Sequence, residues 1–298
     1  MRIVNNGPLG NYRRQEYRKI PVYTPEGVPG KNARGLVVLV SGGYTNHTSL
    51  ADLPSYLARG GWNVKIPVFP EFENTDDTRL VEGGRKRSRE LKDSWQTGMK
   101  AAVFSVVERE LQMNPATAIY LGGLSLGGAA SLIALEDMSL PAKAQIKGLL
   151  LMVPALNYTS LEKNRFLKPI LRRVGLPLKV MMKKRRQRTP PPFDPSLAGH
   201  IQVMTDRPAS ADYAAVLFSE AAKTSLKRLK EYQNLPPVLV IHAGKSDETV
   251  DVSSVDLVRR TFPQISVQEI PGSSHWILPQ SNRHQAFEAI RHFLSQAN

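Results

Sequence analysis

The fold is decided by residues 117–138, which read TAIYLGGLSLGGAASLIALEDM. The first part is apolar, as in a buried strand, and the alanine- and leucine-rich part after Gly128 is typical of a helix. Between them, Gly123-Leu124-Ser125-Leu126-Gly127 fits the pattern G-x-S-x-G. A serine on such a tight strand-to-helix turn holds its hydroxyl clear of the sheet, and the glycines let strand and helix approach closely. We therefore predict that Ser125 is a nucleophile.

Strand and helix patterns alternate on both sides of this turn. Strands are predicted near Arg18–Tyr23 and at 35–43, 62–70, 146–156, 236–244 and 266–273, and helices at 49–61, 91–113, 252–262 and 283–296. Residues 71–89 are polar and predict a loop. Such alternation favours an α/β fold with a mostly parallel central sheet and helices on both faces.

The alternation stops between residues 157 and 231, where basic residues and prolines are frequent. A chain of 298 residues is long enough for one large α/β domain that carries an insertion. We therefore expect a core made of 1–156 and 232–298, interrupted by an inserted basic lid or cap at 157–231.

A serine nucleophile on this motif is followed along the chain by an acid and then by a histidine. Of the six histidines, His275 follows the last strand pattern and precedes the last helix. Asp247 comes just after the strand at 236–244, with Glu248 and Asp251 as competitors. The expected roles are that His275 takes the serine proton and that Asp247 orients and stabilises the imidazole ring.

The other histidines have weaker claims on the chemistry. His242 falls inside a strand pattern and is expected in the core. His284 and His292 fall on the last helix and are expected at the surface, and His200 lies in the insertion. His47 is close to the loop after the strand at 35–43 and is a candidate for lining the pocket.

A developing oxyanion needs backbone N–H donors. The N–H of Leu126, at the start of the helix, is one expected donor. The second is expected from the loop Ser41-Gly42-Gly43-Tyr44-Thr45, where we favour Tyr44 over Gly43. Phe166 and Trp276 are further candidates for the pocket or the lid.

The net charge of +14 is concentrated in one segment. Between Lys163 and Arg188 there are eleven Lys or Arg residues and no acid, which leaves +3 for the rest of the chain. Apolar residues are interleaved with these charges, as in segments that lie on anionic membranes. A solvated lid without a partner and a site for another polyanion are the alternatives. Nucleic acid is disfavoured, because aromatic residues are scarce in the segment.

Composition excludes several classes of protein. The chain contains no cysteine, so disulfides, thiolate metal sites and a cysteine nucleophile are impossible. No apolar run is long enough to predict a membrane-spanning helix, and the first residues do not resemble a signal peptide. We expect a cytoplasmic protein, with peripheral membrane contact as an option, and no cofactor or metal ion.

Four segments together resemble the carboxylesterase and monoacylglycerol lipase branch of the α/β-hydrolases. They read VVLVSGGYTNHTSLADLPSYLARGGWNV, YLGGLSLGGAASL, PPVLVIHAGKSDETV and PGSSHWIL, and residues 205–229 are similar to the end of a lid in that branch. The family's oxyanion loop usually begins His-Gly, whereas this chain has Ser41-Gly42-Gly43, so the resemblance does not choose the donor. The resemblance implies hydrolysis of acyl esters.

The leading hypothesis is therefore a serine hydrolase acting on single-chain acyl esters such as monoacylglycerol or lysophospholipid. The same residues would serve a thioesterase or an acyltransferase. A hydrolase fold without activity, binding polyanions through its basic lid, belongs to a different functional class, and an intact triad counts against it.

Overall fold

The computed structural model describes residues 2–17, 19–26, 33–43, 45–68, 85–158, 193–197, 199–201 and 209–296. Several predictions of the sequence analysis lie outside these residues. They concern Tyr44 as oxyanion donor, Phe166 as a pocket or lid residue, the basic segment from Lys163 to Arg188, and the part of the predicted loop from residue 71 to 84.

One mostly parallel sheet forms the core of the described chain. Its strands are β1 (Arg2–Asn5), β2 (Asn11–Tyr17), β3 (Ile20–Pro25), β4 (Leu36–Val40), β5 (Asn63–Pro67), β6 (Ile119–Leu124), β7 (Ile146–Met152), β8 (Val238–His242) and β9 (Ile265–Glu269). Their spatial order is β1-β2-β3-β5-β4-β6-β7-β8-β9. The pairs β1–β2, β2–β3 and β3–β5 are antiparallel. The pairs that join β5, β4, β6, β7, β8 and β9 in this order are all parallel. The predicted fold class is confirmed.

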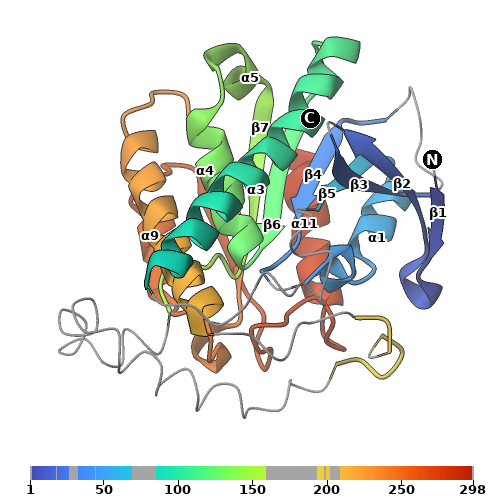
Figure 1. Cartoon of the computed structure of the whole chain (residues 1–298). Coiled ribbons are helices and arrows are strands. Elements are labelled where there is room, and N and C mark those ends of the chain that lie inside the picture. The colour runs from blue at the N-terminus through green and yellow to red at the C-terminus, as the bar shows by residue number, and fades with distance from the viewer. Residues whose placement is uncertain are drawn as a thin grey trace.

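Helices cover both faces of this sheet (Figure 1). They are α1 (Leu53–Arg59), α3 (Arg85–Met113), α4 (Leu126–Asp137), α5 (Leu140–Gln145), α9 (Ala209–Leu229), α10 (Ser253–Arg259) and α11 (His284–Gln296). Residues of α3, α4, α9 and α10 belong to one hydrophobic cluster, and residues of α1 and α11 belong to the other. The sheet therefore has two separate apolar layers, one on each face.

The continuous apolar run of β4 follows from these two layers. Val38 packs into the cluster with α3 and α4, whereas Val37 and Leu39 pack into the cluster with α1 and α11. All five residues of the strand are buried. A strand covered on both faces has no polar side to alternate with, which is why its sequence reads LVVLV.

The chain changes direction at β4, which lies between β5 and β6. It leaves β4 for β5 on one side and then crosses through α3 to β6 on the other side. At such a reversal the loops beyond the carboxyl ends of the two strands diverge and leave a crevice. The loop after β4 and the turn after β6, which carries Ser125, both follow these carboxyl ends.

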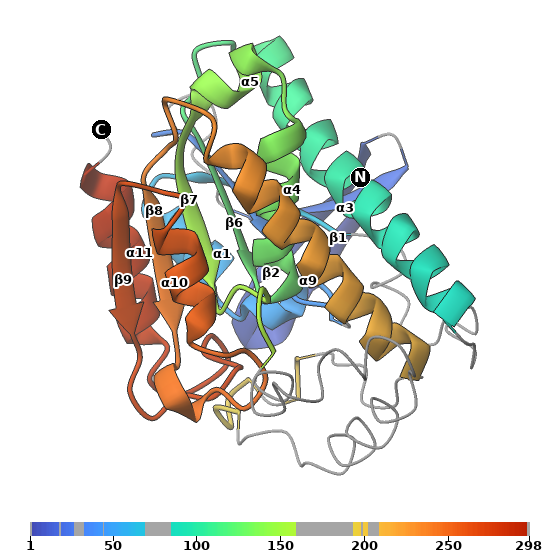
Figure 2. The ribbon, with the colours of Figure 1, turned by 90° about the vertical axis from the view of Figure 1, so that its left-hand side faces the viewer.

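The helix α9 belongs to the helical layer of the core rather than to an insertion. It packs against α3 and α4, and Phe218 on its inner face is 1% exposed. Figure 2 shows it lying alongside both helices. Phe218 and its neighbours on α9 therefore complete the hydrophobic core on this face of the sheet.

The N-terminal region contains more sheet than expected. The strand predicted near Arg18–Tyr23 corresponds to β3, but β1 and β2 were not predicted. β2 reads NYRRQEY and buries Tyr12 and Tyr17, a sparse apolar pattern within polar residues. Helix α3 also begins at Arg85 rather than Leu91.

Among the described residues, no helix is long and apolar enough to cross a membrane.

Candidate active site

Ser125 lies on a strained turn between β6 and α4. Its backbone has φ 55° and ψ −116°, a conformation that costs a residue with a side chain roughly 1–3 kcal/mol. A Cβ atom on Gly127 would overlap the carbonyl oxygens of Val40 and Ser41, and one on Gly123 would overlap the backbone of Gly127. The glycines therefore allow α4 to press against the end of β4, and this contact holds the turn in place.

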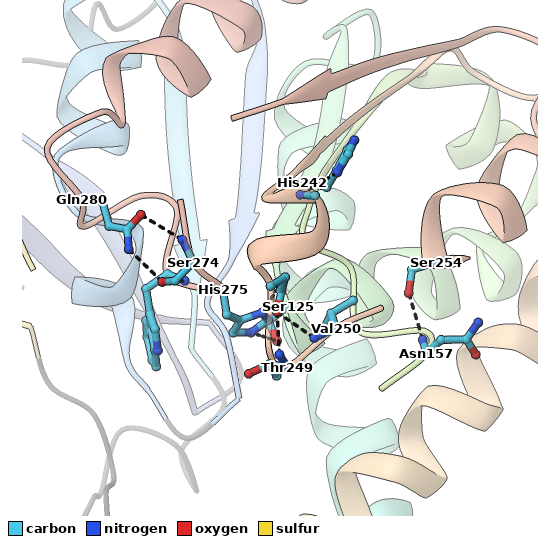
Figure 3. Close-up of polar contacts among 12 residues, drawn as sticks. Ser125, Asn157, His242, Thr249, Val250, Ser254, Ser274, His275 and Gln280 are labelled. Atoms are coloured by element: carbon cyan, nitrogen blue, oxygen red, sulfur yellow. Dashed lines mark hydrogen bonds and ion pairs between the residues drawn. The ribbon is translucent and has the colours of Figure 1, made fainter. Parts of the chain in front are cut away.

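His275 reaches the serine from the loop after β9. Its Nε2 lies 2.9 Å from Ser125 Oγ. The loop is braced by Gln280, whose side chain accepts from the Ser274 N–H at 3.1 Å and donates to the Ser274 hydroxyl at 2.8 Å (Figure 3). The ring therefore approaches Ser125 on a loop with internal hydrogen bonds of its own.

Asp247 lies behind the histidine. Its Oδ2 is 3.0 Å from His275 Nδ1, and its Oδ1 accepts the backbone N–H groups of Thr249 and Val250 at 2.7 and 2.8 Å. Burial alone would raise the pKa of Asp247, but the charge and hydrogen bond of His275 and the two N–H groups outweigh it, so the pKa falls below its usual value. An ionised Asp247 requires Nδ1 to donate, which leaves Nε2 free to accept the serine proton.

The two competing acids are placed elsewhere. The Asp251 carboxylate accepts the Ser253 N–H at 2.9 Å, at the start of α10. Glu248 is exposed. Of the three acids considered, only Asp247 is within hydrogen-bonding distance of His275 in the described structure.

Leu126, one expected oxyanion donor, lies close to Gly43, the alternative to Tyr44 as the second donor. Leu126 is the first residue of α4, so its N–H has no carbonyl partner within the helix. A Cβ atom on Gly43 would overlap the Leu126 side chain, which places the loop after β4 directly against the start of α4. That loop is tightened by a hydrogen bond of 2.9 Å from the Thr45 hydroxyl to the Gly42 carbonyl. The favoured second donor, Tyr44, lies outside the described residues, so the choice between Tyr44 and Gly43 stays a prediction.

His47 is buried and 4% exposed. Its ring stacks on Tyr23 with centroids 3.8 Å apart, and its Nε2 lies 2.6 Å from the Asn6 side-chain nitrogen. Burial, together with the charge of Arg14, lowers the pKa of His47 to about 3. The ring is therefore neutral and offers almost no surface to a substrate, which gives its predicted place in the pocket little support.

Trp276 is partly exposed beside the histidine. Its ring centroid lies 6.2 Å from that of His275 and 5.7 Å from that of Phe193. The sequence analysis did not single out Phe193, because the two aromatic residues are 83 positions apart and meet only in the folded chain. Together they place an aromatic edge next to the site.

The acid loop is tied to the segment that follows β7. The N–H of Asn157 donates to the Ser254 hydroxyl at 3.0 Å (Figure 3), and its carbonyl accepts the Asp251 N–H at 2.8 Å. Of the remaining histidines, His200, His284 and His292 are exposed, the last two on α11 as expected. His242, which was expected in the core, is partly buried at the end of β8.

Comparison with known proteins finds likeness in structure but not in sequence. No family model matches the chain. No curated protein matches it.

Three solved structures illustrate the likeness. A soluble variant of a monoglyceride lipase from Saccharomyces cerevisiae has a TM-score of 0.61 at 15% identity and covers 96% of this chain and 94% of its own. A thermophilic esterase from Thermogutta terrifontis has 0.59 at 18%, covering 96% and 98%. One of two metagenome-derived lipolytic enzymes has 0.59 at 19%, covering 91% and 100%. The chain therefore has the α/β-hydrolase fold.

Proposed function

We propose that this protein is a serine hydrolase that cleaves carboxylic esters through Ser125, His275 and Asp247. One observation carries the proposal: an unbroken line of hydrogen bonds runs from Asp247 through His275 to a serine on a strained turn. The names of the structural neighbours, which include esterases and a monoglyceride lipase, point to the same class of reaction.

The geometry supports a two-step mechanism. Ser125 Oγ attacks the ester carbonyl while His275 Nε2 takes its proton, and the Asp247 carboxylate stabilises the imidazolium ion. The backbone N–H of Leu126 and one from the loop after β4 would hold the oxyanion. His275 then gives its proton to the leaving alcohol. Water attacks the acyl-enzyme while His275 Nε2 takes a proton from it, and the carboxylic acid leaves as His275 returns this proton to Ser125 Oγ.

The substrate class that we favour is single-chain acyl esters, such as monoacylglycerol or lysophospholipid. The aromatic pair Phe193 and Trp276 offers an apolar wall beside His275. The basic segment Lys163–Arg188 would hold the enzyme at an anionic lipid surface, where such substrates reside. We place the protein in the cytoplasm, working at the face of a membrane. Thioesters, or transfer of the acyl group to an alcohol, would use the same residues.

The test combines covalent labelling with a panel of substrates. A fluorophosphonate probe should label the wild type and leave Ser125→Ala unlabelled, whereas Ser295→Ala, an exposed serine on α11, should label normally. Ester substrates of graded chain length, with and without anionic vesicles, then define the acyl group. A wild type that neither labels nor hydrolyses any ester would refute the proposal and favour a binding protein.

A further inference from the structure

His242 holds the turn that leads to Asp247. It is the last residue of β8, and its ring Nδ1 accepts the backbone N–H of Gly244 at 2.9 Å. Gly244 begins the 3-10 turn Gly244–Ser246, and its carbonyl accepts the Asp247 N–H at 3.3 Å. The imidazole ring thus fixes the start of a turn whose end sets the position of the acid.

Glu269 closes the other side of the same turn. Gly244 has φ 60°, and a Cβ atom there would overlap the Glu269 carboxylate. Glu269 Oε2 also lies 4.0 Å from His242 Nε2. The turn is therefore confined between a ring at the end of β8 and a carboxylate at the end of the edge strand β9.

The hydrogen bond requires one protonation state of the ring. Nδ1 can accept the Gly244 N–H only while it carries no proton, so the neutral ring has its proton on Nε2, toward Glu269. Burial lowers the pKa of His242 and Arg259 on α10 adds to this, while the charges of Glu269 and Asp247 raise it, with a net decrease. The ring is therefore neutral over most of the pH range in which the site would work.

We propose that His242, in its neutral form, is a positioning residue that holds Asp247 in register with His275, and that protonation of its ring releases the acid loop. It touches no reacting atom: in Figure 3 the turn lies between His242 and Ser125. The catalytic part of this inference rests on the proposed function, because the register matters only if Asp247 orients a working base.

Two substitutions separate positioning from packing. His242→Phe keeps the shape of the ring but removes the acceptor. The buried Gly244 N–H is then left without its partner, so the turn that carries Asp247 should shift and kcat for a short soluble ester such as p-nitrophenyl butyrate should fall about tenfold. His242→Asn places an oxygen near the position of Nδ1 and should restore most of the activity. KM should change little in both. Equal kcat for Phe and wild type, or no recovery with Asn, would overturn the proposal.

The pH profile supplies a readout that packing alone would not move. At acid pH, wild-type kcat/KM should fall about a further tenfold below that of His242→Asn. The reason is that only the wild type has a side chain at position 242 that can be protonated and so lose the Gly244 hydrogen bond. Glu269→Gln should move this extra loss to still lower pH, since the Glu269 charge favours the protonated ring. Identical acid limbs for wild type and His242→Asn would contradict the proposed release.

A measurement that does not depend on ester hydrolysis separates the two proposals. In protein with ¹⁵N-labelled histidine, the proton shared by His275 Nδ1 and Asp247 should give a far-downfield NMR signal in the wild type and in His242→Asn. The signal should be broadened or lost in His242→Phe. A protein that hydrolyses no ester but shows this pattern would retain the positioning role and lose the hydrolase, and an unchanged signal in His242→Phe would refute positioning.

Discussion

His275 and His47 make an informative comparison, because both follow the carboxyl end of a parallel strand: His275 lies in the loop after β9, and His47 begins the 3-10 helix His47–Leu50 after β4. The His275 ring has a carboxylate on one nitrogen and a serine hydroxyl on the other. The His47 ring is stacked on Tyr23, and among the described residues its Nδ1 has no hydrogen-bond partner. A neighbouring carboxylate stabilises an imidazolium ion, whereas burial away from water, together with the charge of Arg14, opposes protonation of His47. The neighbours of a histidine, rather than its place on the sheet, decide whether it can move a proton.

The strongest test of this contrast removes the group that His275 is proposed to serve. Ser125→Ala should lower kcat by roughly 10⁴–10⁶, as loss of a member of such a triad does, without reducing thermal stability. Steady-state kinetics and a thermal melt are the measurements. A variant that retained most of its turnover would show that His275 does not act on Ser125.

Changing the acid behind His275 should have the next largest effect. Asp247→Asn should lower kcat by about 10⁴, because an amide no longer stabilises the imidazolium and can favour the wrong tautomer. Asp251→Asn is the matched control. Its side chain accepts the Ser253 N–H, a role that asparagine fills equally well, so turnover should stay close to wild type. The opposite ranking would move the acid to Asp251.

His47 should affect stability rather than turnover. Its pKa in the folded protein is lowered from 6.5 to about 3. Below about pH 6.5, His47 therefore binds a proton in the unfolded chain but not in the folded chain. The free energy of unfolding decreases as the pH falls from about 6.5 toward 3. At about 1.4 kcal/mol per pKa unit, the loss reaches up to about 5 kcal/mol at the acid end. Carboxylates such as Asp247, whose pKa is lowered, add their own loss only below about pH 4.

The variant His47→Phe tests how much His47 contributes to the pH dependence of stability. Denaturant unfolding between pH 7 and 4.5 should show a much flatter pH dependence than in the wild type, although the unpaired Asn6 amide lowers stability at pH 7 by about 1–3 kcal/mol. His284→Gln removes an exposed histidine of α11 and should leave the wild-type dependence unchanged. A steep dependence that persisted in His47→Phe would place the titrating group elsewhere.

The smallest effect on chemistry is expected from a change in the basic segment. Replacing Lys183, Lys184, Arg185 and Arg186 with serine should leave hydrolysis of a short soluble ester nearly unchanged and weaken binding to anionic vesicles. Wild-type binding should fall as salt is added, because salt screens the attraction. Co-sedimentation with vesicles at low and high salt measures this binding. Equal binding by the wild type and the four-residue variant would leave the segment without a lipid partner.

Sequence predicted best where one local pattern decides the structure. The apolar run of β4 and the glycine-flanked Ser125 carry their structure within a few residues. The strands β1 and β2 could not be predicted in this way, because NYRRQEY buries only its tyrosines and depends on its neighbours for pairing. The first turns of α3 read RKRSRE and contain no apolar residue from which helical periodicity could be recognised.

The candidate site shows the same division. Chain order and the strand patterns were sufficient to nominate Ser125, Asp247 and His275, because each follows a strand of a parallel sheet. The hydrogen bond between the Gly244 N–H and His242 was not predictable, because a hydrogen bond between a side-chain ring and a backbone N–H produces no periodic pattern in the sequence. The link between Phe193 and Trp276 depends on how distant loops meet.

The residues of the candidate site are far apart along the chain, and this has a consequence during synthesis of the protein. Ser125 and His275 are 150 residues apart and meet only after β8 and β9 have joined the sheet. Contacts of such high sequence separation form late in folding. A ribosome-bound chain that carries Ser125 but not yet His275 would therefore lack the proposed base and could not use this site. Turnover would therefore report that β8, β9 and the loop with His275 are in place, and a product truncated before His275 would not show it.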